Sequence, residues 1–202
     1  MSLLSLNQLI TRHVGPVDLC IEAGECVAIE GSSGSGKSLL LRAIADLDPH
    51  QGEVAIDGVA CTALPAPQWR RRVTLVPAES QWWFERIGDH FETVDEAALE
   101  CLGFGRDTLD WEVARCSTGE RQRLALLRAL QGKPQVLLLD EPTASLDEES
   151  TRCAEELLDD YRREQGAALL WVSHDRRQAA RIASRHFTIR NGTLLPREGG
   201  AP

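Results

Sequence analysis

A glycine-rich loop between a predicted strand and a predicted helix constrains this chain more than any other feature. The loop reads Gly31-Ser32-Ser33-Gly34-Ser35-Gly36-Lys37-Ser38, after the apolar strand 26–30 and before the helical run 39–47. In this composition the pattern G-x-x-x-x-G-K-[ST] is expected by chance about 0.001 times. Glycines let backbone N–H groups approach phosphate oxygens, and the following helix points its positive end at the same place. The sequence therefore predicts a phosphate-binding loop rather than a plain Gly/Ser turn.

Two side chains of this loop add chemistry of their own. Lys37 is one of only two lysines among 22 basic residues. Its compact ammonium group suits the β and γ phosphates of a nucleotide better than a planar guanidinium would. Ser38 follows directly and is placed to ligate Mg²⁺.

A pair of carboxylates ends another apolar strand. Residues 136–139 run straight into Asp140 and Glu141. Strand ends in an open parallel sheet converge on the crevice where ligands bind, so we expect both acids to face the phosphate loop. Asp140 would hold the Mg²⁺ shell, and Glu141 would orient and polarise the water that attacks the γ-phosphate. A helix N-cap is the alternative interpretation of such a pair.

A histidine follows a third apolar strand. His174 comes after residues 168–172, with Ser173 between them and Asp175 next. An isolated histidine is usually a surface residue or a satisfied core residue. Because this one ends a neighbouring strand of the same sheet, it is expected within reach of the γ-phosphate, where it would help fix the attacking water.

Apolar strands alternate with helices along the chain. We predict strands at 17–21, 26–30, 53–57, 73–76, 136–139 and 168–172, and helices at 118–130, 148–163 and 176–183. Asn191-Gly192 joins a last pair of strands, 187–190 and 193–195, as a hairpin. This order predicts an α/β fold with a parallel sheet covered on both faces. We expect one domain over residues 1–202, with an acidic helical subdomain at about 79–116.

The negative charge of the chain is concentrated in that insertion. The 22 basic and 31 acidic residues give a net charge of −9, and residues 85–112, with nine acids and two bases, contribute −7. This balance argues against broad electrostatic binding to nucleic acid. The chain shows neither an apolar run of about 20 residues nor a secretory signal, which predicts an intracellular protein without a membrane span. The spacing of the six cysteines predicts reduced thiols, most of them in the core.

Taken in order, these segments resemble the ATP-binding cassette (ABC) ATPases of ABC transporters. The likeness spans nearly the whole chain, through residues 31–38, 116–123, 136–141, 145–147 and His174. Most telling is Ser117-Thr118-Gly119-Glu120-Arg121-Gln122-Arg123, which looks like the ABC signature sequence and is rare in other phosphate-loop proteins. A finer likeness, through residues 147–150 and 170–175, is to small ATPase subunits of iron-export-type bacterial transporters.

The resemblance implies a P-loop NTPase with ABC-ATPase architecture, namely a parallel-sheet core, N-terminal antiparallel strands and a short α-helical insertion. It also implies a head-to-tail homodimer that closes on two molecules of ATP with Mg²⁺. The implied nucleotide-binding residues of one subunit are Gly31, Ser32, Ser33, Gly34, Ser35, Gly36, Lys37, Ser38 and Leu39. Ser117 and Gly119 would come from the other subunit, and Thr118, Glu120 and Asp147 are also implied to bind nucleotide. Ser38 and Asp140 would hold the metal, and Glu141 and His174 would be catalytic.

The signature segment has a local reason to bind phosphate. Ser117 begins the predicted helix 118–130, so its hydroxyl and the first N–H groups form an anion site that a partner subunit's γ-phosphate would fill. A plain serine N-cap with Glu120 in the first turn is the alternative, and both can be true at once. ATP would thus close the dimer, and hydrolysis would release it.

A separate transmembrane permease would convert this cycle into transport. The chain would be cytoplasmic, peripheral on the inner (plasma) membrane and without direct contact to nucleic acid. The acidic insertion would dock a basic cytoplasmic loop of the permease. Exposure of Trp82 and Trp83 would support this docking, because aromatic residues are common interface anchors. A merely solvated acidic surface is the alternative.

Some positions depart from the family pattern. Ala78 stands where a glutamine would contact Mg²⁺, and Glu79 and Gln81 are two candidate replacements. No aromatic residue stands where the adenine usually stacks; His13 or Val14 lies nearest, which leaves ATP and GTP both open. The remaining replacements are Leu39 for a threonine, Thr118 for the first signature glycine and Cys116 for the leading leucine.

Two other function classes fit the sequence less well. A soluble ABC-type ATPase acting on nucleic acid or the ribosome would usually carry two cassettes or a long coiled-coil insertion, and the sequence has neither. A small phosphate-loop kinase would need an acceptor-binding lid and gives no reason for residues 117–120. The ATPase subunit of a transporter is therefore the expected function, with solute and direction undetermined.

Overall fold

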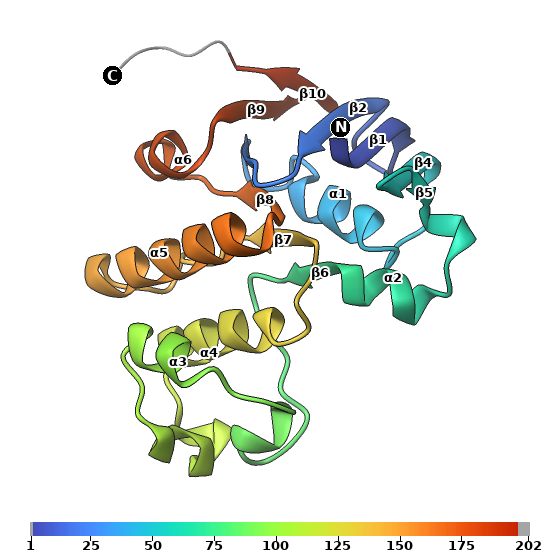
Figure 1. Ribbon diagram of the computed structural model, residues 1–202. Coiled ribbons are helices and arrows are strands. Elements are labelled where there is room, and N and C mark those ends of the chain that lie inside the picture. The colour runs from blue at the N-terminus through green and yellow to red at the C-terminus, as the bar shows by residue number, and fades with distance from the viewer. Residues whose placement is uncertain (1, 198–202) are drawn as a thin grey trace.

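Two β-sheets frame the computed structural model, which describes residues 2–197 (Figure 1). The larger sheet has the strand order β10-β9-β3-β8-β7-β6 and the smaller one β2-β1-β4-β5. The larger sheet consists of β3 (Cys26–Glu30), β6 (Val73–Val76), β7 (Val136–Asp140), β8 (Ala168–Val172), β9 (Arg185–Arg190) and β10 (Thr193–Pro196). The smaller sheet consists of β1 (Ser2–Ile10), β2 (Val17–Glu22), β4 (Gln51–Ile56) and β5 (Val59–Ala60).

The larger sheet is parallel from β9 to β6, as predicted, and its central strands β3, β7 and β8 are buried on both faces. Each neighbouring pair from β9 through β3, β8 and β7 to β6 runs parallel, and only β10 pairs antiparallel with β9. Every residue of β7 is buried. Leu138 belongs to the hydrophobic core on one face, and Leu137 and Leu139 belong to the core on the other face.

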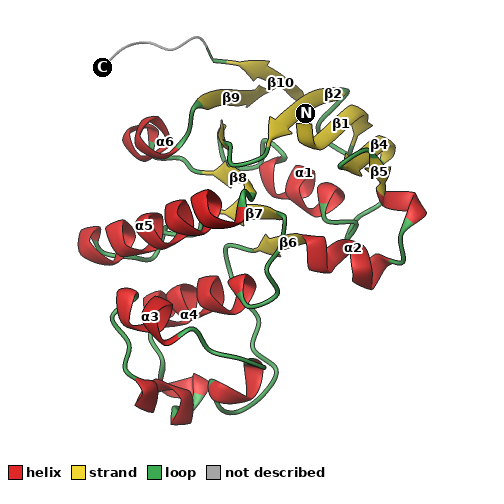
Figure 2. Ribbon diagram, viewed as in Figure 1, coloured by secondary structure: helices red, strands yellow, loops and turns green. Residues whose placement is uncertain are grey.

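Helices and the smaller sheet cover the two faces. α1 packs between the two sheets, and α4 and α5 lie on the opposite face, above the insertion that carries α3 (Figures 1 and 2). The helices are α1 (Lys37–Ile44), α2 (Ala66–Arg72), α3 (Glu96–Cys101), α4 (Thr118–Leu130), α5 (Glu148–Gln165) and α6 (Arg176–Ile182). Within residues 2–197, no helix combines the length and the apolar composition that crossing a bilayer requires.

The first strand was missed by the sequence analysis. β1 is the central strand that pairs with both β2 and β4. Its register shifts between Asn7 and Ile10, and Gln8 has a φ of 50°. This irregularity leaves two successive exposed residues in the strand, so the apolar residues do not alternate strictly and the period of two is hidden.

The acidic insertion is less helical than predicted. Between β6 and α4 the structure has one six-residue α-helix, α3, and three short 3₁₀ turns. Asp95 caps α3 by accepting from the Ala98 N–H at 3.1 Å. Gly103, with a φ of 79°, follows that helix closely. Most of the insertion is therefore loop and 3₁₀ turn rather than α-helix.

The bounds of one predicted helix and the predicted burial of the cysteines also differ from the structure. α1 begins at Lys37 and ends at Ile44 rather than spanning 39–47, because Asp46 adopts a left-handed φ of 55°. The six cysteines are all free, as predicted. Three of them, rather than most, are buried; Cys20 and Cys101 are exposed and Cys153 is intermediate.

Candidate functional site

The phosphate loop connects the end of β3 to the N-terminus of α1. Gly36 takes the N-cap position of α1 with a φ of 100°, and no side chain caps the helix. Lys37 is 7% exposed, and its Nζ donates to the Gly31 carbonyl at 2.8 Å and to the Ser32 carbonyl at 3.1 Å. The lysine thus lies across the loop, with its charge next to the uncapped helix end, where an anion is stabilised.

A glycine is required at position 36 for two reasons. Its φ lies in the left-handed region. A Cβ atom there would also stand 2.5 Å from Val14 Cγ2. Val14 is 2% exposed and packs against the loop at Gly36. Of His13 and Val14, the two residues considered for adenine contact, Val14 is therefore unsuited.

A hollow of about 560 Å³ opens around the loop. It is lined by His13, Gly31, Ser33, Gly34, Ser35, Gly36, Lys37, Ser38, Leu39, Glu141 and His174. The predicted phosphate loop and both predicted catalytic side chains therefore meet. Neither Glu79 nor Gln81 lines the hollow, so neither takes the position of the missing glutamine in this structure.

Asp140 lies at the end of β7, next to the lining residue Ser38 but not itself among the lining residues, and is 8% exposed. Burial raises the pKa of its carboxyl above the ordinary value, and contact with the Ser38 hydroxyl and the nearby Lys37 charge partly offset this rise, while Glu141 adds to it. The contact joins the two side chains predicted to hold a metal. A bound cation would favour the ionised carboxylate that burial disfavours.

Glu141 and His174 form a pair at the edge of the hollow. His174 Nδ1 lies 3.1 Å from Glu141 Oε2. Glu141 has a positive φ of 49°, and its N–H donates to the Val172 carbonyl at 3.0 Å. With the proton on Nδ1, the ring donates to the carboxylate and Nε2 can accept a hydrogen bond.

The signature helix α4 begins with a complete capping box. Ser117 Oγ accepts from the Glu120 N–H at 3.2 Å, and Glu120 Oε2 accepts from the Ser117 N–H at 2.7 Å. These hydrogen bonds hold the pKa of Glu120 below its ordinary value. The N-cap interpretation is thereby confirmed, while Ser117, Thr118, Gly119 and Glu120 all lie outside the hollow.

Gln122 is a site residue that the sequence analysis did not assign. It is 4% exposed on α4, donates from Nε2 to the Glu141 carbonyl at 3.0 Å and accepts from the Ser145 N–H at 3.1 Å. Through these two bonds the signature helix holds the loop that follows β7. A glutamine on the apolar face of a predicted helix was the available signal.

Asp147 was also predicted to contact nucleotide. In the structure its carboxylate caps α5, accepting from the Ser150 N–H at 2.8 Å and from the Ser150 hydroxyl at 3.1 Å. These bonds lower its pKa. Asp147 lies outside the hollow of its own subunit.

ATP and Mg²⁺ fit the residues that meet here. Ser35 Oγ is buried in the loop without a hydrogen-bond partner, and the N-terminus of α1 has no cap. Mg²⁺ is usually held by one or two protein oxygens together with substrate phosphates, so Ser38 and Asp140 suffice. When bound, the metal neutralises charge on the phosphate oxygens during transfer. Within the described residues no cluster of three His, Cys, Asp or Glu side chains could hold a metal alone.

Comparison with known proteins identifies the class to which this fold and site belong. Residues 14–144 match the family described as ABC transporter. The chain is 37% identical over 193 residues to the aliphatic sulfonates import ATP-binding protein SsuB 2 of Paracoccus denitrificans, covering 93% of this chain and 75% of that protein. It is 35% identical over 200 residues to the lipoprotein-releasing system ATP-binding protein LolD of Bordetella avium, covering 89% and 86%.

Solved structures agree on the fold. A bacterial Atm1-family ABC exporter with ATP bound matches with a TM-score of 0.83 and 21% identity; the match covers 95% of this chain but 38% of the exporter chain. The ATP-binding cassette MJ0796, in a dimeric post-hydrolysis state with ADP and Pi, matches with a TM-score of 0.81 and 23% identity, covering 98% and 100%.

The chain therefore belongs to the ATP-binding subunits of ABC transporters. It is a subunit that binds and hydrolyses ATP to power transport, as the sequence predicted.

Asp140→Asn separates the effect of the buried carboxylate on stability from its role in binding Mg·ATP. Because the pKa of Asp140 is raised in the folded state, its ionised form lowers the free energy of unfolding at neutral pH, and the neutral amide removes that cost. We expect a higher unfolding temperature without ligand. The wild type should gain about 2.7 kcal/mol from Mg·ATP at 100 times the dissociation constant, and the variant should lose most of this gain. Thermal unfolding with Mg·ATP, and with ATP and EDTA, measures both; a lower ligand-free unfolding temperature would contradict the argument.

Proposed function

We propose that two copies of this chain close head to tail on two ATP molecules and that the closure drives a separate transmembrane permease. The main support is that the site is incomplete within one subunit. The hollow contains the phosphate loop, Glu141 and His174 but none of residues 117–120. The exposed N-terminus of α4, with Ser117 at its cap, is an anion site that has no anion of its own subunit to bind.

Within each site the residues divide the chemistry. Lys37 and the N-terminus of α1 bind the phosphates, and Ser38 and Asp140 hold Mg²⁺. Glu141 accepts the hydrogen bond of the attacking water, and His174, paired with it at 3.1 Å, orients the carboxylate and faces the γ-phosphate. His13, exposed at the rim of the hollow, is the candidate contact for the base. This division supplies what phosphoryl transfer to water requires.

The permease would dock on the insertion, at the inner face of the membrane. All nine acidic side chains of residues 85–112 are exposed. Trp83 is 64% and Phe84 50% exposed, whereas Trp82, the other predicted anchor, is half-buried. His90, 6% exposed, fixes this aromatic segment because its Nε2 accepts from the N–H groups of both Trp83 and Phe84 at 3.0 Å. A rigid pair of exposed aromatic rings is a suitable interface anchor.

The surface beside Trp83 is more basic than the sequence predicted. A groove of about 760 Å³ runs next to it, lined by Arg70, Arg71 and Arg128 together with Glu92. The arginines come from α2 and α4, so the folding of distant segments places them beside the acidic insertion. We therefore propose a permease surface of mixed charge, with acidic groups against the arginines and basic groups against the insertion.

Membership of the iron-export-type subfamily is proposed only from the finer likeness, the similarity of residues 147–150 and 170–175 to such subunits. SsuB 2 and LolD are named for sulfonate import and lipoprotein release. Sequence identity between ATPase subunits does not indicate the transported solute, because the solute contacts the permease.

Glu141→Gln tests the dimer most directly. It keeps the shape of the side chain and removes the charge that polarises water, so ATP should bind while turnover falls by about 100-fold or more. Light scattering at saturating Mg·ATP should show an accumulated dimer. Glu149→Gln, an exposed acid at the start of α5, is the matched control and should leave turnover unchanged. A Glu141→Gln variant that stays monomeric would count against the dimer. Lys37→Ala, by contrast, should abolish nucleotide binding.

Ser117 variants separate capping from phosphate binding. Ser117→Ala should cost about 1 kcal/mol of stability through the lost cap and should weaken ATP-driven dimerisation. Ser117→Asp keeps a good N-cap but sets a carboxylate against the partner's γ-phosphate, so it should fold as stably as wild type and fail to dimerise. Chemical denaturation and light scattering give the two readouts. Normal dimerisation of Ser117→Asp would exclude this end of α4 from the site.

Docking is tested with two sets of variants. Trp83→Ala combined with Phe84→Ala should reduce recruitment to permease-containing membranes about tenfold or more. Charge reversal of Glu92, Asp95 and Glu96 should reduce it less and in a salt-dependent manner. The same reversal of Glu149, Glu156 and Glu164 on α5 is the control. Unchanged sedimentation with membranes for the first two sets would remove the insertion as the docking surface.

A further inference from the structure

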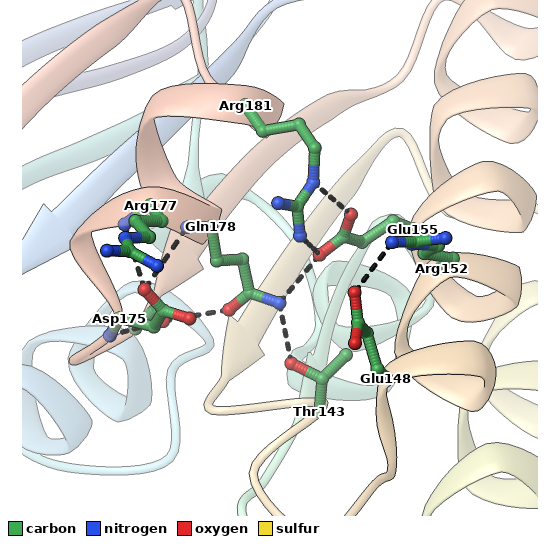
Figure 3. Close-up of polar contacts among 9 residues, drawn as sticks. Thr143, Glu148, Arg152, Glu155, Asp175, Arg177, Gln178 and Arg181 are labelled. Atoms are coloured by element: carbon green, nitrogen blue, oxygen red, sulfur yellow. Dashed lines mark hydrogen bonds and ion pairs between the residues drawn. The ribbon is translucent and has the colours of Figure 1, made fainter. Parts of the chain in front are cut away.

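A buried polar cluster lies behind the Glu141–His174 pair. It consists of Thr143, Glu155, Ser173 and Gln178, which are 8%, 9%, 4% and 5% exposed. The four residues come from the loop after β7, from α5, from the end of β8 and from α6. Figure 3 shows the Gln178 amide at the centre, pointing between Thr143 and Glu155.

The Gln178 amide is bonded on both sides. Its Nε2 donates to Thr143 Oγ1 and to Glu155 Oε1, each at 2.8 Å. Its Oε1 accepts from Ser173 Oγ at 2.8 Å. The Glu155 carboxylate accepts only, which sets the orientation of the amide. One side chain therefore joins three segments that are far apart in the sequence.

The outer side of the cluster is closed by an arginine. Arg181, one turn after Gln178 on α6, donates to both oxygens of Glu155 at 2.7 and 2.8 Å (Figure 3). The buried carboxylate thus has a charged partner as well as the amide. A fully bonded buried network of this kind is rigid, and removing one member leaves others unsatisfied.

The bonded residues adjoin the catalytic pair. Ser173 directly precedes His174, and Thr143 follows Glu141 by two positions. The His174 side chain is 69% exposed, so packing does little to hold it. Besides its contact with Glu141, the orientation of His174 depends on the backbone on either side, which the Gln178 amide helps to hold together.

We propose that Gln178 is a positioning residue for ATP hydrolysis, whose amide holds the segment of His174 against the segment of Glu141. This inference rests on the proposed roles of Glu141 and His174. Gln178 touches no nucleotide: it lies outside the hollow and acts only through the two loops. ATP binding, which depends on the phosphate loop, is independent of it.

Gln178→Leu removes the three hydrogen bonds at similar volume. We expect a roughly 10- to 100-fold lower turnover at saturating Mg·ATP, because a small misplacement of catalytic groups is costly, with the ATP dissociation constant changed less than about twofold. Arg177→Leu, the exposed neighbour on α6, is the matched control and should leave turnover unchanged.

The decisive measurement combines Gln178→Leu with His174→Ala. If Gln178 acts through His174, the double variant should turn over as slowly as His174→Ala alone, because no histidine remains to be positioned. A structural defect would lower turnover further in that background. Equal fold losses with and without His174 would overturn the proposal, as would wild-type turnover of Gln178→Leu.

An exchange of charge provides rescue. Gln178→Glu alone sets a second carboxylate against Glu155 and should impair turnover. Gln178→Glu with Glu155→Gln restores a donor facing an acceptor and should recover more than half of wild-type turnover; no recovery would contradict a role for this bond.

If His174→Ala itself turns over normally, the proposed role of His174 fails. If His174→Ala is slow while Gln178→Leu is not, only the present inference fails.

Discussion

The site depends on one row of hydrogen-bonded residues across the parallel sheet. Val172 of β8 pairs with Ile29 of β3 on one side and with Asp140 of β7 on the other. The chain leaves these three strands at the same edge, so the phosphate loop, Glu141 and His174 follow within two residues of that row. Because parallel strands have a fixed register and are buried on both faces, this arrangement cannot slip without exposing the core. Every other feature of the site is built on this row.

Buried polar side chains hold further parts of the site in place outside the sheet. Gln122 fastens the signature helix to the loop after β7, and the Gln178 amide fastens the same loop to the segment of His174. Both glutamines are almost fully buried. Apolar residues at these positions would fill the space, but they would not specify how one loop lies against another. The His174 side chain is exposed and that of Glu141 is partly buried, whereas the two glutamines behind them are enclosed.

Much of this could be predicted because the signals were local. A glycine-rich turn, a lysine in a chain whose basic residues are mostly arginine, and acids at the end of an apolar strand can each be recognised from a few neighbouring residues. The hairpin at Asn191-Gly192 and helix 118–130 were likewise predicted from adjacent residues and are confirmed. β1 escaped because a bulge at Gln8 breaks the period of two, and the insertion contains less α-helix than expected because its helical segments span only three to six residues.

The sequence by itself therefore determined the fold class, the phosphate loop and the identity of the residues at the strand ends, because backbone conformation and side-chain chemistry are local properties. Only the tertiary structure decided which of them meet. It placed His174 beside Glu141, excluded Glu79 and Gln81 from the hollow, and left the signature segment outside it. It also brought arginines of α2 and α4 beside the acidic insertion and gathered three polar side chains around Gln178. Such contacts join segments tens of residues apart, and their geometry follows from strand register and helix packing rather than from any short pattern.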